Sequence, residues 1–149
     1  MITEELQSLF IRDLTKLKTE IGAYRDEKTL WKTDKDILNS AGNLCLHLVG
    51  NLNTYIGAQL GNSGYIRQRD LEFSLKDIPR SGLIEQVEET MEMILFSFDK
   101  LTEEDLRKDY PIEPLGYQMT TGYFLIHLYG HLNYHLGQVN YHRRLLDIL

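Results

Sequence analysis

Cysteine is almost absent from this chain: Cys45 is the only one among 149 residues. A single thiol can form no disulfide within the chain and supplies no thiolate cluster for a metal ion. Any metal site would therefore use nitrogen or oxygen ligands. We expect Cys45 itself to be a small residue of the hydrophobic core.

The chain also lacks long apolar runs and an excess of positive charge. No run approaches the roughly 18 apolar residues of a membrane span. Glu4, Glu5, Arg12 and Asp13 interrupt the first twenty residues, where a signal peptide would need an apolar core. We therefore expect a cytoplasmic protein without a membrane partner. Lys and Arg number 16 against 22 Asp and Glu, and a net charge of −6 does not favour nucleic acid as a partner.

The length and composition are those of an ordinary globular protein. Hydrophobic residues make up 42% of the chain and charged residues 26%, which is typical of a folded domain with a core. A chain of 149 residues is long enough for one such core and short for two, so we predict a single domain over residues 1–149.

Apolar residues recur three and four positions apart in four segments, the spacing of helices that bury one face. The expected helices cover residues 3–24, 34–61, 81–98 and 120–147, with Asp34, Ser81 and either Thr120 or Thr121 as N-caps. Their apolar faces are Leu6, Phe10, Leu14, Leu17, Ile21 and Tyr24; Ile37, Ala41, Leu44, Leu48, Leu52 and Tyr55; Ile84, Val87, Met91, Ile94 and Phe98; and Leu125, Leu128, Leu132, Leu136 and Val139. Four long helices without a strand pattern predict an all-α four-helix bundle.

Two of the predicted connections have features of their own. Residues 61–80 show no sustained period, and such a long connection in a compact domain is often functional. Thr102-Glu103-Glu104-Asp105 resembles a capping box, which predicts a single helical turn before the last helix.

Histidines on two of these helices suggest a metal site. His131 and His135 are four residues apart and therefore share one helix face, and His47 lies on the flank of the second helix. Bundles hold metal ions between facing helices, so the three histidines are candidate ligands. His127 with His131 would satisfy the same spacing, and two histidines four apart also occur by chance. Spacing alone leaves both pairs open.

Three stretches resemble a known superfamily. The sequence His131-Leu132-Asn133-Tyr134-His135-Leu136-Gly137-Gln138, followed by Arg143 and a leucine pair, resembles the last-helix motif of the DinB-like (YfiT-like) four-helix bundle metalloproteins. Residues 39–52 are similar to the superfamily's histidine-bearing second helix. The stretch Arg67-x-Arg69-Asp70-x-Glu72-Phe73 is similar to a branch of unknown function within it. The resemblance covers nearly the whole chain and implies an up-down-down-up bundle with a long connection between helices 2 and 3.

The resemblance also implies a site and a chemistry. It places the metal ligands at His47, His131 and His135, leaves His127 and His142 outside the site, and implies a divalent ion such as zinc or nickel. Members with known activity are transferases or isomerases that use bacillithiol, mycothiol or glutathione. Members also often pair through helix faces, which implies a homodimer.

Three imidazoles leave at least one coordination position open, as in catalytic rather than structural sites. A divalent ion there could activate a water molecule or hold a low-molecular-weight thiol as thiolate. The leading hypothesis is therefore a thiol-dependent transferase that acts on small electrophiles. The alternatives are a non-catalytic, self-associating bundle and a metal-dependent hydrolase, and the sequence does not select among the three.

Side chains one turn from the expected ligands could orient them. Asn43, Asn51 and Gln138 are in such positions and are candidates to bond the outer ring nitrogens of the histidines. The asparagines could equally cap or hydrate the helix surface.

The residues flanking the second helix give weaker signals. Trp31, Tyr65 and Phe73 are candidates to line a substrate pocket, although aromatic residues near helix ends more often close the core. Arg67 and Arg69 could bind the carboxylates of a thiol cofactor or be solvated loop charges.

Overall fold

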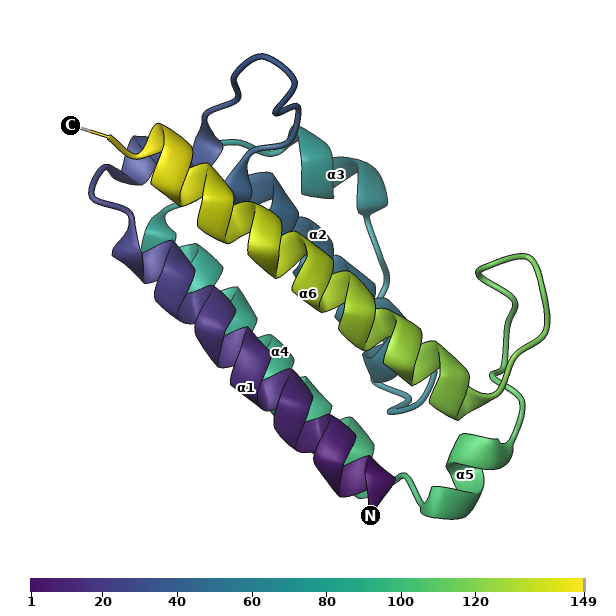
Figure 1. Ribbon diagram of the computed structural model, residues 1–149. Coiled ribbons are helices and arrows are strands. Elements are labelled where there is room, and N and C mark those ends of the chain that lie inside the picture. The colour runs from purple at the N-terminus through teal and green to yellow at the C-terminus, as the bar shows by residue number, and fades with distance from the viewer. Residues whose placement is uncertain (149) are drawn as a thin grey trace.

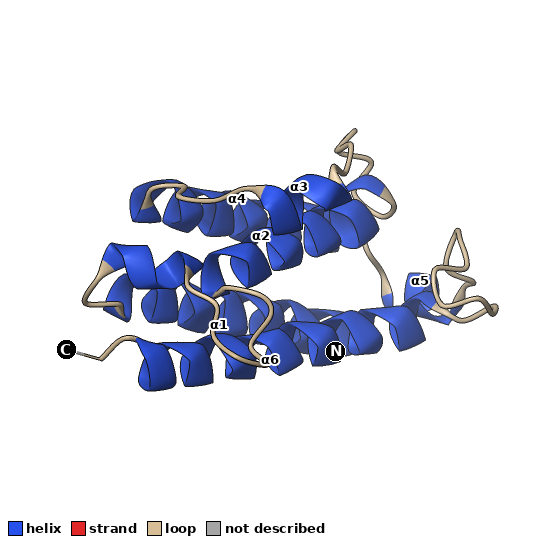
Figure 2. Cartoon of the chain, turned by 90° about the horizontal axis from the view of Figure 1, so that it is seen from above, coloured by secondary structure: helices blue, strands red, loops and turns tan. Residues whose placement is uncertain are grey.

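The protein is all-helical. The computed structural model describes residues 1–148 (Figure 1). Its elements are α1 (Ile2–Ala23), the 3-10 helix η1 (Glu27–Trp31), α2 (Ala41–Leu52), the π-helical segment η2 (Asn53–Ala58), α3 (Arg69–Ser74), α4 (Arg80–Asp99), α5 (Glu103–Arg107) and α6 (Thr121–Leu146). Within residues 1–148 there is no strand, only the isolated bridges Asp34–Ile37 and Asp109–Thr120. The predicted all-α class is confirmed (Figure 2).

The four long helices lie side by side, with α1 and α2 each packed against both α4 and α6 (Figures 1 and 2). The N–H of Arg25, just after α1, donates to Asp147, just after α6, so these two helices end together. The N–H of Thr3 donates to Glu103, just after α4, so α4 ends where α1 begins. The Nζ atom of Lys100, just after α4, donates to the carbonyl of Gly61, just after η2, so the segment formed by α2 and η2 ends beside the end of α4. Helices α1 and α6 therefore run in one direction, and α2 and α4 run in the other.

The predicted apolar faces of the first and last helices form the core. All six face residues of α1 and all five of α6 are buried. Every residue of α2 is buried, because α2 is covered by α3 as well as by α4 and α6. On α4 the buried face includes Leu83, Thr90 and Ser97, whereas Ile84 and Met91 are only partly buried. No helix among residues 1–148 combines the length and apolar character needed to cross a membrane.

Two of the predicted N-caps are wrong. Asp34 does not start a helix: its backbone exchanges two hydrogen bonds with Ile37, closing a turn in which Lys35 has a φ of 50°. Helix α2 begins at Ala41 instead, where the Ser40 hydroxyl accepts from the N–H of Asn43. Helix α4 begins one residue before Ser81, directly after Pro79, because proline holds the backbone angle and needs no N–H there.

The other connections are more ordered than their sequences suggest. Residues 61–80 contain α3, whose six residues are too few to show a helical period. Thr102 and Asp105 form the predicted capping box at the start of α5. The Thr120 hydroxyl caps α6, which was one of the two predicted starts. The connections therefore place short helices at both ends of the long ones, and α3 lies over α2.

Candidate metal centre

Three histidine side chains from α2 and α6 converge on one point. The Nε2 atom of His131 lies 3.2 Å from Nε2 of His47 and 3.2 Å from Nε2 of His135. One nitrogen of each ring lies within 4.8 Å of the others. These are the three histidines that the resemblance implies as ligands, and the structure brings them together as a group that could hold a metal ion.

The convergence follows from the packing of α2 against α6. His131 and His135 are one turn apart on the same flank of α6, beside the buried residues Leu132 and Leu136. His47 lies near the middle of α2 and faces that flank near the middle of α6, to which α2 runs antiparallel. His47 is buried, whereas His131 and His135 are half-buried and leave the site open on one side.

His47 is held from outside the two helices by a buried carboxylate. Its Nδ1 atom lies 3.0 Å from Oε1 of Glu72, on α3. Arg67 donates to both oxygens of the same carboxylate, at 2.9 Å from Nε and 3.0 Å from Nη2. A carboxylate at the outer nitrogen of a histidine fixes the ring orientation and leaves the other nitrogen free to bind a metal.

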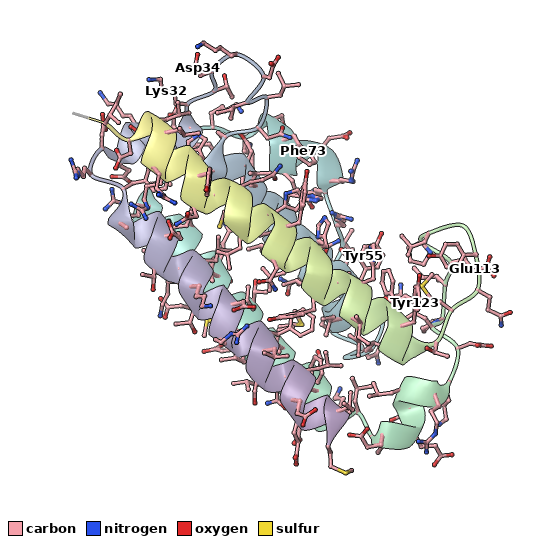
Figure 3. All side chains as sticks on the ribbon, in the orientation of Figure 1. Lys32, Asp34, Tyr55, Phe73, Glu113 and Tyr123 are labelled. Carbon is pink, nitrogen blue, oxygen red and sulfur yellow. The ribbon has the colours of Figure 1, made fainter. Side chains whose placement is uncertain are left out.

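Contacts between α3 and α2 hold the backbone around Glu72 where its carboxylate can reach His47. The side-chain amide of Asn43 donates to the carbonyls of Glu72 and Leu75, each at 2.9 Å, and so fastens α3 to α2. A Cβ atom at Gly50 would lie only 1.9 Å from Oε2 of Glu72. The glycine is therefore required for the Glu72 carboxylate to lie across α2. The ring of Phe73, which is labelled in Figure 3, lies against the His47 ring at a centroid distance of 5.0 Å.

The two histidines of α6 have different surroundings. His135 Nδ1 lies 2.7 Å from Oε1 of Gln138, one turn further along α6. The Nδ1 atom of His131 is buried and has no hydrogen-bond partner among residues 1–148. Two of the three rings are thus oriented by hydrogen bonds, and the third is positioned by packing between them.

The protonation states suit metal ligands. Burial lowers the pKa of His131 to about 4, and the charges of His135 and His47 act in the same direction. Burial also lowers the pKa of His135, although the hydrogen bond that its Nδ1 donates to Gln138 acts in the opposite direction. Burial alone would raise the pKa of Glu72, but hydrogen bonds from His47 and Arg67 outweigh it and lower that pKa. At neutral pH, His131 and His135 are therefore uncharged and Glu72 is ionised.

The arrangement of the ring nitrogens fits the binding of a cation. An ionised Glu72 and the carbonyl oxygen of Gln138 only accept hydrogen bonds, so Nδ1 of His47 and of His135 carries the proton. In the neutral form of these two rings, each Nε2 atom presents a lone pair, and His131 Nε2 can donate to one of them at most. Two nitrogens that bind zinc tetrahedrally at about 2.0–2.1 Å lie about 3.3 Å apart. The separations of 3.2 Å are close to that value.

The remaining histidines lie outside the centre. His127 is exposed and stacks on Phe124, with 12° between the ring planes. His142 is buried, and its two nitrogens lie 2.7 Å from the Tyr24 hydroxyl and 2.8 Å from the Lys32 carbonyl. Both nitrogens of His142 are therefore used in packing the helix ends.

The three candidates for orienting the ligands have different roles. Gln138 bonds His135 directly. Asn43 acts one step away, because its amide holds the backbone of Glu72 rather than a histidine ring. Asn51 is buried, and its Oδ1 has no partner among residues 1–148.

The aromatic and basic residues that flank the second helix contact different neighbours. Phe73 contacts His47, while Trp31 packs against Gly42 of α2, where a Cβ atom would lie 2.7 Å from its ring. Arg67 is bound to Glu72. Arg69 is exposed, and its guanidinium lies 5.5 Å from the centre of the Phe73 ring.

Cys45 takes no part in the centre. It is fully buried in the core, and burial raises the pKa of its thiol to about 12. Its predicted role as a core residue is confirmed.

The Glu72 carboxylate is the group at the candidate centre whose contact with a histidine the spacing did not predict, although Glu72 belongs to the stretch from Arg67 to Phe73 that carries the resemblance. Glu72 follows Arg67 by five residues in a connection without helical period, and several other acids lie nearby in the sequence. Only the docking of α3 on α2 distinguishes it from these. The same contact explains why a long connection is held close to the histidines.

Comparison with known proteins identifies the family of the chain but gives no activity for it. No curated protein matches the chain significantly. The sequence model of a family described as a protein of unknown function (DUF1572) matches residues 5–147. This match spans α1 from residue 5 onward, the whole of α2, α4 and α6, and all three histidines of the centre. The chain therefore belongs to the DUF1572 family.

Proposed function

We propose that this protein binds a divalent metal ion, zinc or nickel, through His47, His131 and His135. The observation that carries the proposal is the convergence of three Nε2 atoms, with His131 Nε2 at 3.2 Å from each of the other two. Lone pairs that face one another at this distance repel unless a proton or a cation lies between them. Glu72 and Gln138 hold the outer nitrogens and so direct the lone pairs inward.

We further propose that the chain is a single DinB-like (YfiT-like) domain with the up-down-down-up topology. The directions of α1, α2, α4 and α6 support this assignment, as does the long connection that separates α2 from α4. The positions of the histidines, one on the second long helix and two on the last, support it as well.

The activity we propose is transfer of a low-molecular-weight thiol, of the bacillithiol or glutathione type, to a small electrophile. Three protein ligands leave a coordination position for an exogenous molecule, and the half-buried His131 and His135 give access to it. A bound divalent ion would supply Lewis acidity that favours the thiolate form of such a cofactor. The thiol must come from outside the chain, because Cys45 is buried and its pKa of about 12 keeps it protonated.

Metal content is the first test. Protein purified without an affinity tag should contain about one divalent ion per chain by elemental analysis, and His131→Ala should remove it. Equal metal content in the two proteins, or none in either, would refute the metal-binding proposal.

Turnover is the second test. Metal-loaded protein should consume an alkylating electrophile in the presence of bacillithiol or glutathione, and a chelator should stop the reaction. Metal-dependent hydrolysis, the competing chemistry at the same centre, predicts chelator-sensitive turnover of an ester or amide without any thiol.

A different class of function, non-catalytic self-association as a homodimer, has one observation in its favour. The outer face of α6 exposes six large apolar or aromatic residues along its length and just beyond it: Tyr123, Ile126, Tyr134, Tyr141, Leu145 and Ile148. Contiguous exposed apolar surface is typical of protein interfaces. Sedimentation of the wild type and of Ile126→Glu tests it, since a dimer through this face should dissociate when a charge is placed there.

A further inference from the structure

A cavity of about 390 Å³ lies next to the histidine centre. It is enclosed by the connection between η1 and α2, by the first turn of α2 and by the C-terminal half of α6. Its walls include Ile37, Leu38, Leu44, Gln138, Tyr141 and Leu145. Lys32 and Asp34, labelled in Figure 3, mark the connection where it rises beside the end of α6. The volume is within the range of small-molecule sites, about 300–1,000 Å³.

The cavity and the metal centre share a side chain. Gln138 lines the cavity, and its Oε1 is the atom that lies 2.7 Å from His135 Nδ1. On the opposite wall, Leu44 lies about one turn before His47 on α2. None of the three histidines of the centre lines the cavity, so a molecule in it would have one end at Gln138, on the outer side of the His135 ring.

The outer wall of the cavity is held in place by backbone bonds. The turn from Asp34 to Ile37 is closed by N–H to carbonyl bonds of 3.2 and 2.8 Å. The start of the connection is tied to α6, because Nε2 of His142 lies 2.8 Å from the Lys32 carbonyl. The end of the connection is fixed by Ser40, which caps α2. These bonds fix the connection that forms the outer wall, so the cavity is a defined part of the folded structure.

The lining determines which molecules fit. Leu38, Tyr141 and Leu145 keep 78%, 61% and 57% of their surface exposed, so an apolar ligand could bury surface that the protein leaves in water. Asp36 brings a carboxylate to the lining, and none of the lining residues is Lys or Arg. Because the oxygen of Gln138 accepts from His135, the side-chain NH₂ of Gln138 is the donor group that it can offer to a ligand. The lining therefore favours an uncharged molecule and offers it one donor, the Gln138 amide, at the end nearest His135.

We propose that this cavity is the substrate site: it binds a neutral, largely apolar small molecule whose hydrogen-bond acceptor faces Gln138. The role of this cavity as a substrate site rests on the metal centre proposed above. Binding of the small molecule itself does not need the metal ion. We assign the cavity to the substrate and not to an anionic thiol, because the lining contains the carboxylate of Asp36 and no Lys or Arg that could bind an anion.

Fluorescence titration with two naphthalene probes of similar size tests the binding. Prodan, a neutral ketone, should bind saturably to one site per chain, and the anionic dansylate should bind at least about tenfold more weakly. Leu145→Glu should weaken prodan at least about tenfold, because it places a charge on the cavity wall. Ile126→Glu is the matched control, on the same helix and similarly exposed but outside the cavity, and it should change the affinity less than about twofold.

Three results would overturn the binding proposal: no saturable prodan binding, equal weakening by the two glutamate variants, or dansylate binding as tight as prodan. Since Ile126 and Leu145 share the outer face of α6, a loss caused by dissociation of a dimer would affect both variants and not Leu145→Glu alone.

Proton NMR relaxation of prodan with cobalt(II) added tests the position of the cavity beside the metal. Relaxation should be enhanced in the wild type and not in His131→Ala. If elemental analysis shows that the wild type binds cobalt, and the protons of prodan still relax no faster with the wild type than with His131→Ala, the cavity is not the substrate site. If no cobalt binds, the proposed metal function fails, while the Leu145→Glu comparison still decides whether the cavity binds neutral ligands.

Discussion

The Nδ1 atom of His47 lies 3.0 Å from the carboxylate of Glu72, which belongs to a short helix 25 residues further along the chain. Both side chains are buried, and Arg67 binds the same carboxylate on its other side. The contact joins the long second connection directly to the candidate metal centre. It explains why α3 is docked on α2 rather than left as part of a solvated loop.

Glu72→Gln should weaken metal binding about 10–100-fold, the usual effect of changing a partner that orients a metal-bound histidine. Glutamine preserves the volume and can still accept from His47, but it removes the charge that Arg67 neutralises. Competition with a coloured chelator would measure the affinity. Asp70→Asn, an exposed acid of the same helix, is the control and should leave the affinity unchanged. Equal affinities for Glu72→Gln and the wild type would contradict the assigned role.

Gly50→Ala should act on the same contact from the opposite side. Alanine in a helix interior is normally more stable than glycine by about 1 kcal/mol. At Gly50 the added Cβ would lie 1.9 Å from a Glu72 oxygen, so the carboxylate must move away from His47. We expect no gain in urea stability and at least about a tenfold loss of metal affinity.

Gly137→Ala is the matched control for this substitution, because a Cβ there meets no atom within 4 Å. It should raise the free energy of unfolding by up to about 1 kcal/mol and leave metal binding intact. The role of Gly50 would be disproved if both alanine variants were stabilised equally and bound metal equally.

His131→Ala should abolish the rise in melting temperature that zinc or nickel produces. A ligand at 100 times its dissociation constant stabilises the folded state by about 2.7 kcal/mol. His131 lies nearest to both other ligands, so its loss should remove that gain. Differential scanning fluorimetry with added metal would show it, with His127→Ala as the control that keeps the full shift. A metal-induced shift lost equally in both variants would favour the His127 pair instead.

The buried carboxylate of Asp13 should make stability fall in acid. Burial would raise the pKa of Asp13, but hydrogen bonds from Arg12, Tyr129 and Asn133 outweigh it and lower that pKa. A lowered pKa in the folded state means that the stabilisation is present above the unfolded value of about 3.9. It is lost as pH falls through the folded value.

Urea unfolding between pH 7 and pH 2 would measure the Asp13 effect. Asp13→Asn should cost about 1–3 kcal/mol at pH 7, because it weakens hydrogen bonds to a buried charge. Its stability should then vary less with pH than that of the wild type below about pH 4. Parallel pH profiles for the two proteins would show that Asp13 does not contribute in this way.

Cys45 should not react in the folded protein. With a pKa of about 12, roughly one thiol in ten thousand is ionised at pH 8, and the side chain is buried. Labelling with a thiol reagent should therefore proceed only at the rate of unfolding, whereas the urea-unfolded chain should react at once. Fast stoichiometric labelling of the native protein would reopen the question of an internal thiol nucleophile.

The sequence by itself determined the features that repeat along one helix. The apolar periods of α1 and α6 predicted their buried faces, because the same spacing recurs over about four to five turns. The four-residue separation of His131 and His135 placed both on one flank of α6 for the same reason. The capping box at Thr102 was also predicted, and the cap of α6 was narrowed to Thr120 or Thr121, since each cap involves neighbours within three residues.

Only the tertiary structure decided the contacts between segments that are distant in the chain. Asp34 could have capped a helix, but the bond pair with Ile37 and the anchoring of Lys32 by His142 hold it in a turn. The choice of His47 and His135 as the neighbours of His131 depends on the packing of α2 on α6. The pairing of Glu72 with His47 depends on α3, which is too short to show a period. Periodicity reports which residues share a face, whereas the partner of that face is set by how the helices pack.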